Sequence, residues 1–134
     1  MRVRRSNHGC GQFTYNQTKI LIVAGGQNKY FKMSTTEFLI QNNGIFGRWM
    51  YGPRLPRKMT YPVMVSDESK VYLIDSNHGT ILKLKCPETS LLHCQWITLN
   101  QRTNLNQPIA AKLVPDYRVD CQVTKRLKVP KKFF

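Results

Sequence analysis

The chain has 134 residues, a length that fits one domain of ordinary size and excludes two. Hydrophobic residues make up 41% and charged residues 21%, a composition that excludes a disordered chain. The formal net charge of +14 suggests an anionic partner, and the longest apolar run, residues 20–24, is far too short for a membrane-spanning helix.

Short segments rich in β-branched and aromatic residues alternate with turn residues along the chain, and no segment has the period of an amphipathic helix. The first four predicted strands cover residues 11–15, 19–24, 37–40 and 47–51. The others cover residues 61–65, 70–74, 80–85, 94–99 and 109–114. Asn, Gly, Asp and Ser residues, which accept tight turns, separate them. The sequence therefore predicts an all-β fold of antiparallel strands.

The predicted strands form units that repeat. Trp49 and Trp96 each end a unit and stand 47 residues apart. The apolar strand before Gly25 and Gly26 in the first unit corresponds to residues 71–76 in the second, where Asp75 and Ser76 replace the two glycines and Gly79 is expected to supply the turn. A repeat of this length is typical of proteins built by stacking one structural unit.

The motif residues of these units resemble the kelch repeat. They are the glycine pair after the second strand, the Trp-x-x-Gly-Pro-x-Leu-Pro run at residues 49–56, and the second tryptophan: Gly25, Gly26, Trp49, Gly52, Pro53 and Trp96. The resemblance covers roughly residues 6–118 and implies antiparallel, four-stranded kelch-type propeller blades. In that interpretation glycine allows close packing, tryptophan fills the wedge between neighbouring blades, and Gly-Pro turns the chain toward the next blade.

The resemblance divides the chain into parts: a basic end (1–5), a first blade (6–58), a degenerate second blade (59–105), a closing strand (106–118) and a basic tail (119–134). Propellers typically use four to eight blades. Two blades and a strand therefore imply an incomplete propeller. A fragment of a longer protein is the preferred explanation, and the alternatives are self-association of copies into a ring and a chain that is only marginally folded.

The function that the resemblance implies is protein binding through loops, as in the substrate adaptors of ubiquitin ligases. Loops on a rigid β scaffold commonly carry binding, and aromatic and arginine side chains commonly dominate interfaces. Residues 27–32 contain Tyr30 and Phe31, and residues 54–58 contain Arg54 and Arg57, so these four are the candidate partner-binding residues. The alternative is that an aromatic ring packs under its loop and that the basic residues are simply solvated.

No motif for catalysis, for a metal or for a cofactor is present in the sequence. His8, His78 and His93 each stand alone in turn-like surroundings, without the partners that a triad needs. The Gly25-Gly26-Gln27 run lacks the longer glycine pattern and the helix of a phosphate-binding loop. The sequence therefore predicts a non-enzymatic protein with no catalytic residues, no cofactor and no metal site.

The four cysteines, Cys10, Cys86, Cys94 and Cys121, include no C-x-x-C pair. They are expected to be reduced thiols in or near a β core, because free cysteine is among the most buried residue types. Reduced cysteines, together with the polar stretch after the N-terminal arginines, predict a cytoplasmic protein.

Much of the positive charge lies at the two ends of the chain. Residues 1–5 and 125–134 hold eight basic and no acidic residues. Such tails bind anions loosely, and no nucleic-acid recognition motif accompanies them. A basic surface that binds nucleic acid or another polyanion is therefore the alternative function, and no membrane partner is expected.

Overall fold

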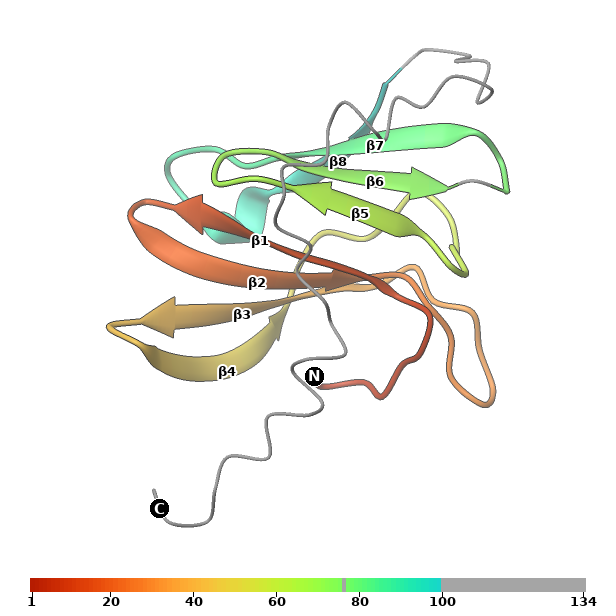
Figure 1. The fold of residues 1–134 in the computed structure, drawn as a ribbon, viewed down its shortest axis with the longest axis horizontal. Coiled ribbons are helices and arrows are strands. Elements are labelled where there is room, and N and C mark those ends of the chain that lie inside the picture. The colour runs from red at the N-terminus through yellow and green to blue at the C-terminus, as the bar shows by residue number, and fades with distance from the viewer. Residues whose placement is uncertain (76, 100–134) are drawn as a thin grey trace.

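The computed structural model describes residues 1–75 and 77–99, and within this part the strands form two four-stranded antiparallel sheets (Figure 1). The first sheet contains β1 (Gly9–Tyr15), β2 (Thr18–Ala24), β3 (Thr36–Asn42) and β4 (Ile45–Tyr51). The second contains β5 (Val63–Ser66), β6 (Val71–Asp75), β7 (Thr80–Lys85) and β8 (Gln95–Thr98), with the 3₁₀ helix η1 (Leu91–His93) before the last strand. In each sheet, strands that follow one another in sequence are neighbours. The first eight predicted strands are confirmed, and residues 109–114 lie outside the described part.

Two hairpins of the first sheet use two-residue turns with positive φ. Asn16 and Gln17 connect β1 to β2, and Asn43 and Gly44 connect β3 to β4. Such turns match the right-handed twist of paired strands, and asparagine and glycine tolerate their backbone angles best. In the second sheet Gly79, with a φ of 63°, lies in the turn between β6 and β7, as expected.

The two sheets approach each other most closely along β1 and β5. Gly9 and Gly11 are buried on the face of β1 that meets the second sheet. A Cβ atom on Gly9 would lie 2.7 Å from the Leu73 side chain, and one on Gly11 would collide with the Ser66 hydroxyl. That hydroxyl accepts a hydrogen bond from the Gln12 backbone N–H at 3.0 Å. Glycine at both positions therefore lets the two strands pack together.

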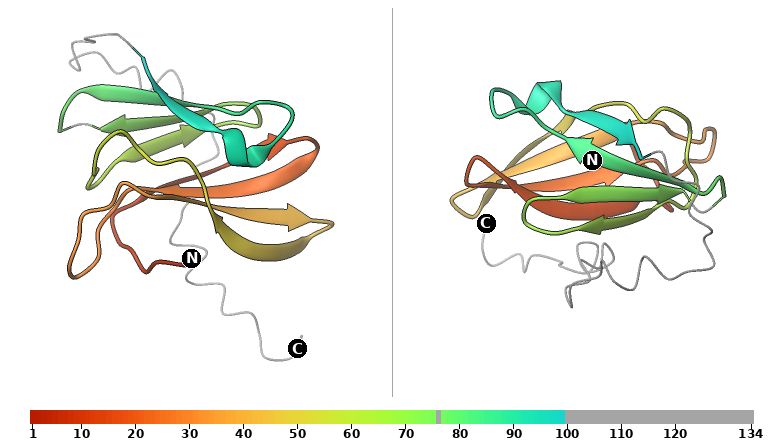
Figure 2. Two further views of the ribbon diagram at one scale, coloured as in Figure 1. Left: turned by 180° about the vertical axis from the view of Figure 1, so that it is seen from behind. Right: turned by 90° about the horizontal axis from the view of Figure 1, so that it is seen from above.

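The two sheets stack front to back: their equivalent faces point in the same direction, so that opposite faces of the two sheets meet at the contact. Phe38 and its cross-strand neighbour Met50 point into the core between the sheets. Trp49 precedes Met50 and therefore points to the opposite face, away from the second sheet. Trp96, the equivalent residue of β8, points toward the first sheet, where its Nε1 donates to Thr36 Oγ1 at 3.0 Å. The two views of Figure 2 show the two sheets stacked on each other.

Cys86 and Cys94 form a disulfide bond, so the prediction of four reduced thiols is wrong for this pair. The register that places Lys85 opposite Gln95 also brings the next two residues, the cysteines, opposite each other. Cys10 is disulfide-bonded as well, and Cys121 lies outside the described residues. Sequence spacing alone missed the bond because the hairpin register, rather than a C-x-x-C motif, brings the two sulfurs together.

Candidate functional site

One end of the strands, called the loop end below, holds the N-terminal segment and three connections between strands (Figures 1 and 2). The β7–β8 connection, which contains η1, lies at the opposite end. The loop end comprises residues 4–8, the β2–β3 loop (25–35), the connection between the sheets (52–62) and the β6–β7 turn. Backbone hydrogen bonds join the first three segments: Ser6 N–H to Gln27 O (2.8 Å), Gly26 N–H to Met59 O (2.8 Å) and Tyr61 N–H to Asn7 O (3.1 Å). The short hairpin turns of the first sheet lie at the opposite end.

Gly25 and Gly26 form the base of the β2–β3 loop. Their φ angles are 66° and 87°, a region that side chains rarely allow. A Cβ on Gly25 would lie 2.8 Å from Met59 O, and one on Gly26 would lie 2.5 Å from Ser6 O. The glycine pair therefore allows both the turn and the close approach of the neighbouring segments.

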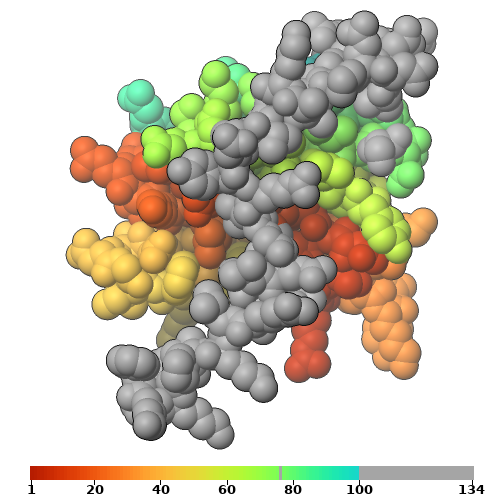
Figure 3. Space-filling model, in the orientation of Figure 1, coloured from red at the N-terminus to blue at the C-terminus, as the bar shows by residue number. Residues whose placement is uncertain are grey.

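The tip of the loop presents Tyr30 and Phe31 to solvent. Their exposed fractions are 74% and 66%, so neither ring packs under the loop. The Asn28 side chain holds the tip, since its Oδ1 accepts hydrogen bonds from the backbone N–H groups of Tyr30 (2.9 Å) and Phe31 (2.7 Å). The Lys29 ammonium lies 5.6 Å from the centroid of the Tyr30 ring. Figure 3 shows the loop projecting from the edge of the molecule.

A buried ion pair lies at the base of the β2–β3 loop. Arg5 and Glu37 have fully buried side chains and lie 2.5 Å apart. The Arg5 guanidinium also donates to Gly25 O at 3.0 Å and to Thr35 O at 2.8 Å, the two ends of the loop. The Glu37 carboxylate in turn accepts from the backbone N–H of Arg2 at 2.6 Å. Both charges are thus hydrogen-bonded, as buried charges must be.

Arg57 is partly exposed at the loop end, where it is paired with a buried carboxylate. Its Nε lies 3.2 Å from the buried Asp75 carboxylate, and its Nη2 donates to Thr80 Oγ1. His78 Nδ1 lies 2.8 Å from the same carboxylate, so this histidine is not isolated, contrary to the expectation from sequence. These contacts join the connection between the sheets to the β6–β7 hairpin, so the cluster has a structural role.

The structure brings three of the four candidate partner-binding residues to the exposed surface of the loop end. Tyr30 and Phe31 are adjacent, with ring centroids 6.1 Å apart. Arg54 is exposed in the connection between the sheets, whose next residue, Leu55, donates its N–H to Ser34 O of the loop at 2.8 Å. Arg57, whose side chain is 37% exposed, is paired with Asp75.

The described part of the loop end exposes basic side chains and no acidic side chain. Its two carboxylates, Glu37 and Asp75, are buried and paired with arginines. The exposed basic residues come from three different segments: Arg4, Lys29, Lys32, Arg54 and Lys58.

The exposed carboxylates of residues 1–75 and 77–99 lie at the other end of the strands. They are Asp67 and Glu68 in the β5–β6 turn and Glu88 in the β7–β8 connection. Hydrogen bonds from the backbone N–H groups of Ser69 and Lys70 lower the pKa of Asp67. This carboxyl therefore stays ionised at neutral pH, and the two ends of the molecule differ in charge.

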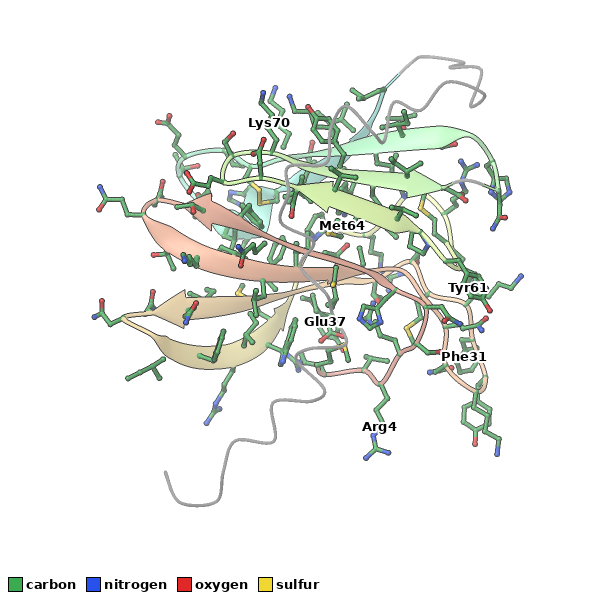
Figure 4. The ribbon with its side chains drawn as sticks, viewed as in Figure 1. Arg4, Phe31, Glu37, Tyr61, Met64 and Lys70 are labelled. Carbon is green, nitrogen blue, oxygen red and sulfur yellow. A yellow bond between two sulfur atoms is a disulfide. The ribbon has the colours of Figure 1, made fainter. Side chains whose placement is uncertain are left out.

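An open pocket of about 480 Å³ lies between residues 4–6 and the β2–β3 loop. Arg4, Lys29 and Tyr30 line it together with the polar side chains of Ser6 and Asn28. Figure 4 shows Arg4 and Phe31 at this end of the molecule, with Tyr61, which is 59% exposed, above them.

Sequence reasoning missed the different roles of Arg4 and Arg5. The three N-terminal arginines form one basic run, so nothing in the sequence distinguished the buried Arg5 from its exposed neighbour. Lys29 and Lys32 flank the aromatic pair in the sequence. Their spacing around two aromatic residues was a usable signal for a basic, aromatic surface.

A scan against protein-family models finds no match for this sequence, and a search of curated proteins finds none either. Across residues 1–75 and 77–99, no three His, Cys, Asp or Glu side chains group as metal ligands would. The same residues contain no helix of the length and apolarity that a membrane crossing requires.

Proposed function

We propose that this chain is a non-enzymatic protein-interaction module built from kelch-type blades, and that the loop end is its binding surface. The observation that carries the proposal is the pair of exposed aromatic rings, Tyr30 and Phe31, on a loop whose backbone is fixed from several sides. Ordering such a loop in advance lowers the entropy cost of binding, and exposed aromatic side chains are frequent interface anchors.

The blade assignment is supported by the order of the strands and by the tryptophans. Two sequential four-stranded sheets that stack front to back have the relation that neighbouring propeller blades have. The outward face of the second sheet carries Val63 and Ile97, which are 51% and 39% exposed. Such apolar faces are what an incomplete propeller would leave for further blades, either those of a longer chain or those of another copy.

A binding role fits the polar clusters better than catalysis does. The Asp75 carboxylate accepts from His78 and lies beside Arg57, and the three side chains together fix a turn. The cytoplasmic location expected from sequence stays a prediction, and the Cys86–Cys94 disulfide weighs against it because disulfides are rare in reducing compartments.

Selection of binders from a phage library of random peptides tests the proposal. Peptides enriched on the 134-residue chain should bind the Tyr30→Ala/Phe31→Ala variant about 30-fold more weakly or worse, the loss expected for a hot spot of about 2 kcal/mol. The matched control is Ile45→Ala/Phe46→Ala, which removes an adjacent exposed pair (74% and 53%) from the opposite end. Peptides that tolerate the first variant, or lose affinity equally with both, would contradict the proposal.

A further inference from the structure

The charges of the loop end indicate what kind of protein segment it receives. We propose that it binds an acidic peptide segment, with a carboxylate side chain in the pocket beside Arg4 and Lys29 and an apolar or aromatic side chain against Tyr30 and Phe31. This inference rests on the proposed function and adds the chemistry of the partner.

The first step is the separation of charge across the molecule. Exposed basic groups surround the aromatic pair without an exposed carboxylate beside them, whereas the exposed acidic groups of the described residues lie at the far end of the strands together with exposed lysines. Figure 4 labels Arg4 at the loop end and Lys70 at the β5–β6 turn of the opposite end. A partner with like charge is repelled at the loop end, and a partner with acidic residues is steered to it.

The second step is that the local carboxylates cannot neutralise these cations. The Glu37 carboxylate is already paired with Arg5 and hydrogen-bonded to the backbone of the N-terminal segment. The Asp75 carboxylate is already in contact with Arg57 and His78. Arg4 lies next to the buried ion pair in sequence, yet its own side chain is exposed and lines the pocket. The cationic groups at the pocket therefore remain for an external anion.

The third step concerns the kind of anion. The pocket walls carry hydrogen-bond donors and acceptors beside the cations: Ser6, Gln27 and Asn28. The neighbouring aromatic rings are tilted by 50° to each other rather than parallel, and the loop that holds them projects as a compact tip. A nucleic acid would need a basic track with a series of stacking platforms along it. A single pocket beside one aromatic pair fits a short peptide with alternating acidic and apolar side chains.

The test starts from the phage-selected peptides that depend on Tyr30 and Phe31. They should be enriched in Asp and Glu and depleted in Lys and Arg. For the strongest binder, a synthetic version with every Asp changed to Asn and every Glu to Gln should bind at least about tenfold more weakly. Affinities are measured by fluorescence anisotropy on the full chain at physiological salt.

A charge-matched pair of variants locates the effect. Arg4→Glu/Lys29→Glu should weaken the acidic peptide about tenfold or more, whereas Lys70→Glu/Lys85→Glu should change its affinity less than about twofold. Both variants change the net charge by the same amount, so a difference between them reports the site rather than the overall field. Circular dichroism establishes that both are folded.

The outcomes separate the two proposals. Selected peptides that need Tyr30 and Phe31 but bind equally well as Asn and Gln versions would overturn the acidic partner and leave the binding surface intact. Selected peptides that ignore the aromatic pair would overturn both. A single-stranded oligonucleotide of equal charge that binds as tightly as the peptide, with the same loss in Arg4→Glu/Lys29→Glu, would also overturn the peptide inference in favour of a general polyanion site.

Discussion

Arg5 and Arg4 show how far the roles of two adjacent arginines can differ. The Arg5 side chain is fully buried and bonds to Glu37, Gly25 and Thr35, whereas that of Arg4 is exposed. The sequence predicted a basic N-terminal end but did not distinguish a buried arginine from an exposed one, because the burial of Arg5 depends on a carboxylate 32 residues away. The exposure of Tyr30 and Phe31 was one of two alternatives in the sequence, and the Asn28 hydrogen bonds to the loop tip explain why exposure prevails.

We predict that Arg5→Ala destabilises the chain by about 3–5 kcal/mol, because it leaves the Glu37 carboxylate buried without its ion-pair partner. Urea unfolding followed by tryptophan fluorescence measures the free energy of unfolding. Arg4→Ala is the matched control, and its effect should stay within about 0.5 kcal/mol since the side chain is exposed. Equal effects of the two substitutions would show that the buried pair does not support the fold.

At the level of elements, the strand pattern and the turns followed from the sequence, since alternating apolar residues and Asn-Gly turns are local signals. The packing of the sheets did not. The close approach of β1 and β5 depends on Gly9 and Gly11, and nothing in the sequence indicates that these two glycines face another sheet. The disulfide depends on the β7–β8 register, which spacing alone does not reveal.

A substitution at the sheet contact tests that packing. Gly11→Ala should destabilise the chain by roughly 1–3 kcal/mol, because its Cβ meets the Ser66 hydroxyl and the Met64 sulfur where the sheets are closest. Gly47→Ala is the comparison, since a Cβ there meets only Ile40 O at 3.3 Å within the same sheet. Thermal unfolding of both variants decides the question, and a Gly47→Ala effect as large as that of Gly11→Ala would contradict the account.

The disulfide makes a separate prediction for the β7–β8 connection. The Cys86→Ala/Cys94→Ala variant should lose roughly 2–3 kcal/mol of stability, the loop-closure contribution expected for a connection of this length. Cys94 is buried at 3% exposure in the core cluster that also contains Leu91, so its replacement adds a packing loss. Unfolding measured without reductant provides the comparison with the unmodified chain, and an unchanged midpoint would show that the bond does not stabilise this hairpin.

For the whole molecule, the fold brings the N-terminal segment, the β2–β3 loop and the connection between the sheets together at one end. The basic groups of Arg4, Lys29 and Arg54 come from three segments that are far apart in sequence, so only the fold shows that they surround one aromatic pair. The net charge of +14 suggested an anionic partner, and much of this charge lies at the two ends of the chain. The structure shows in addition that the two ends of the described part differ in charge, which the net charge alone does not reveal.

Amide chemical-shift mapping by NMR tests the central claim most directly. A peptide selected on the chain is titrated into the isotope-labelled protein, and the shifts are followed residue by residue. Binding at the loop end predicts that the largest changes fall at residues 4–8 and 25–32, with little change at the β3–β4 and β5–β6 turns. The largest changes at those two turns, or changes spread evenly over both ends, would contradict the assignment of the loop end as the binding surface.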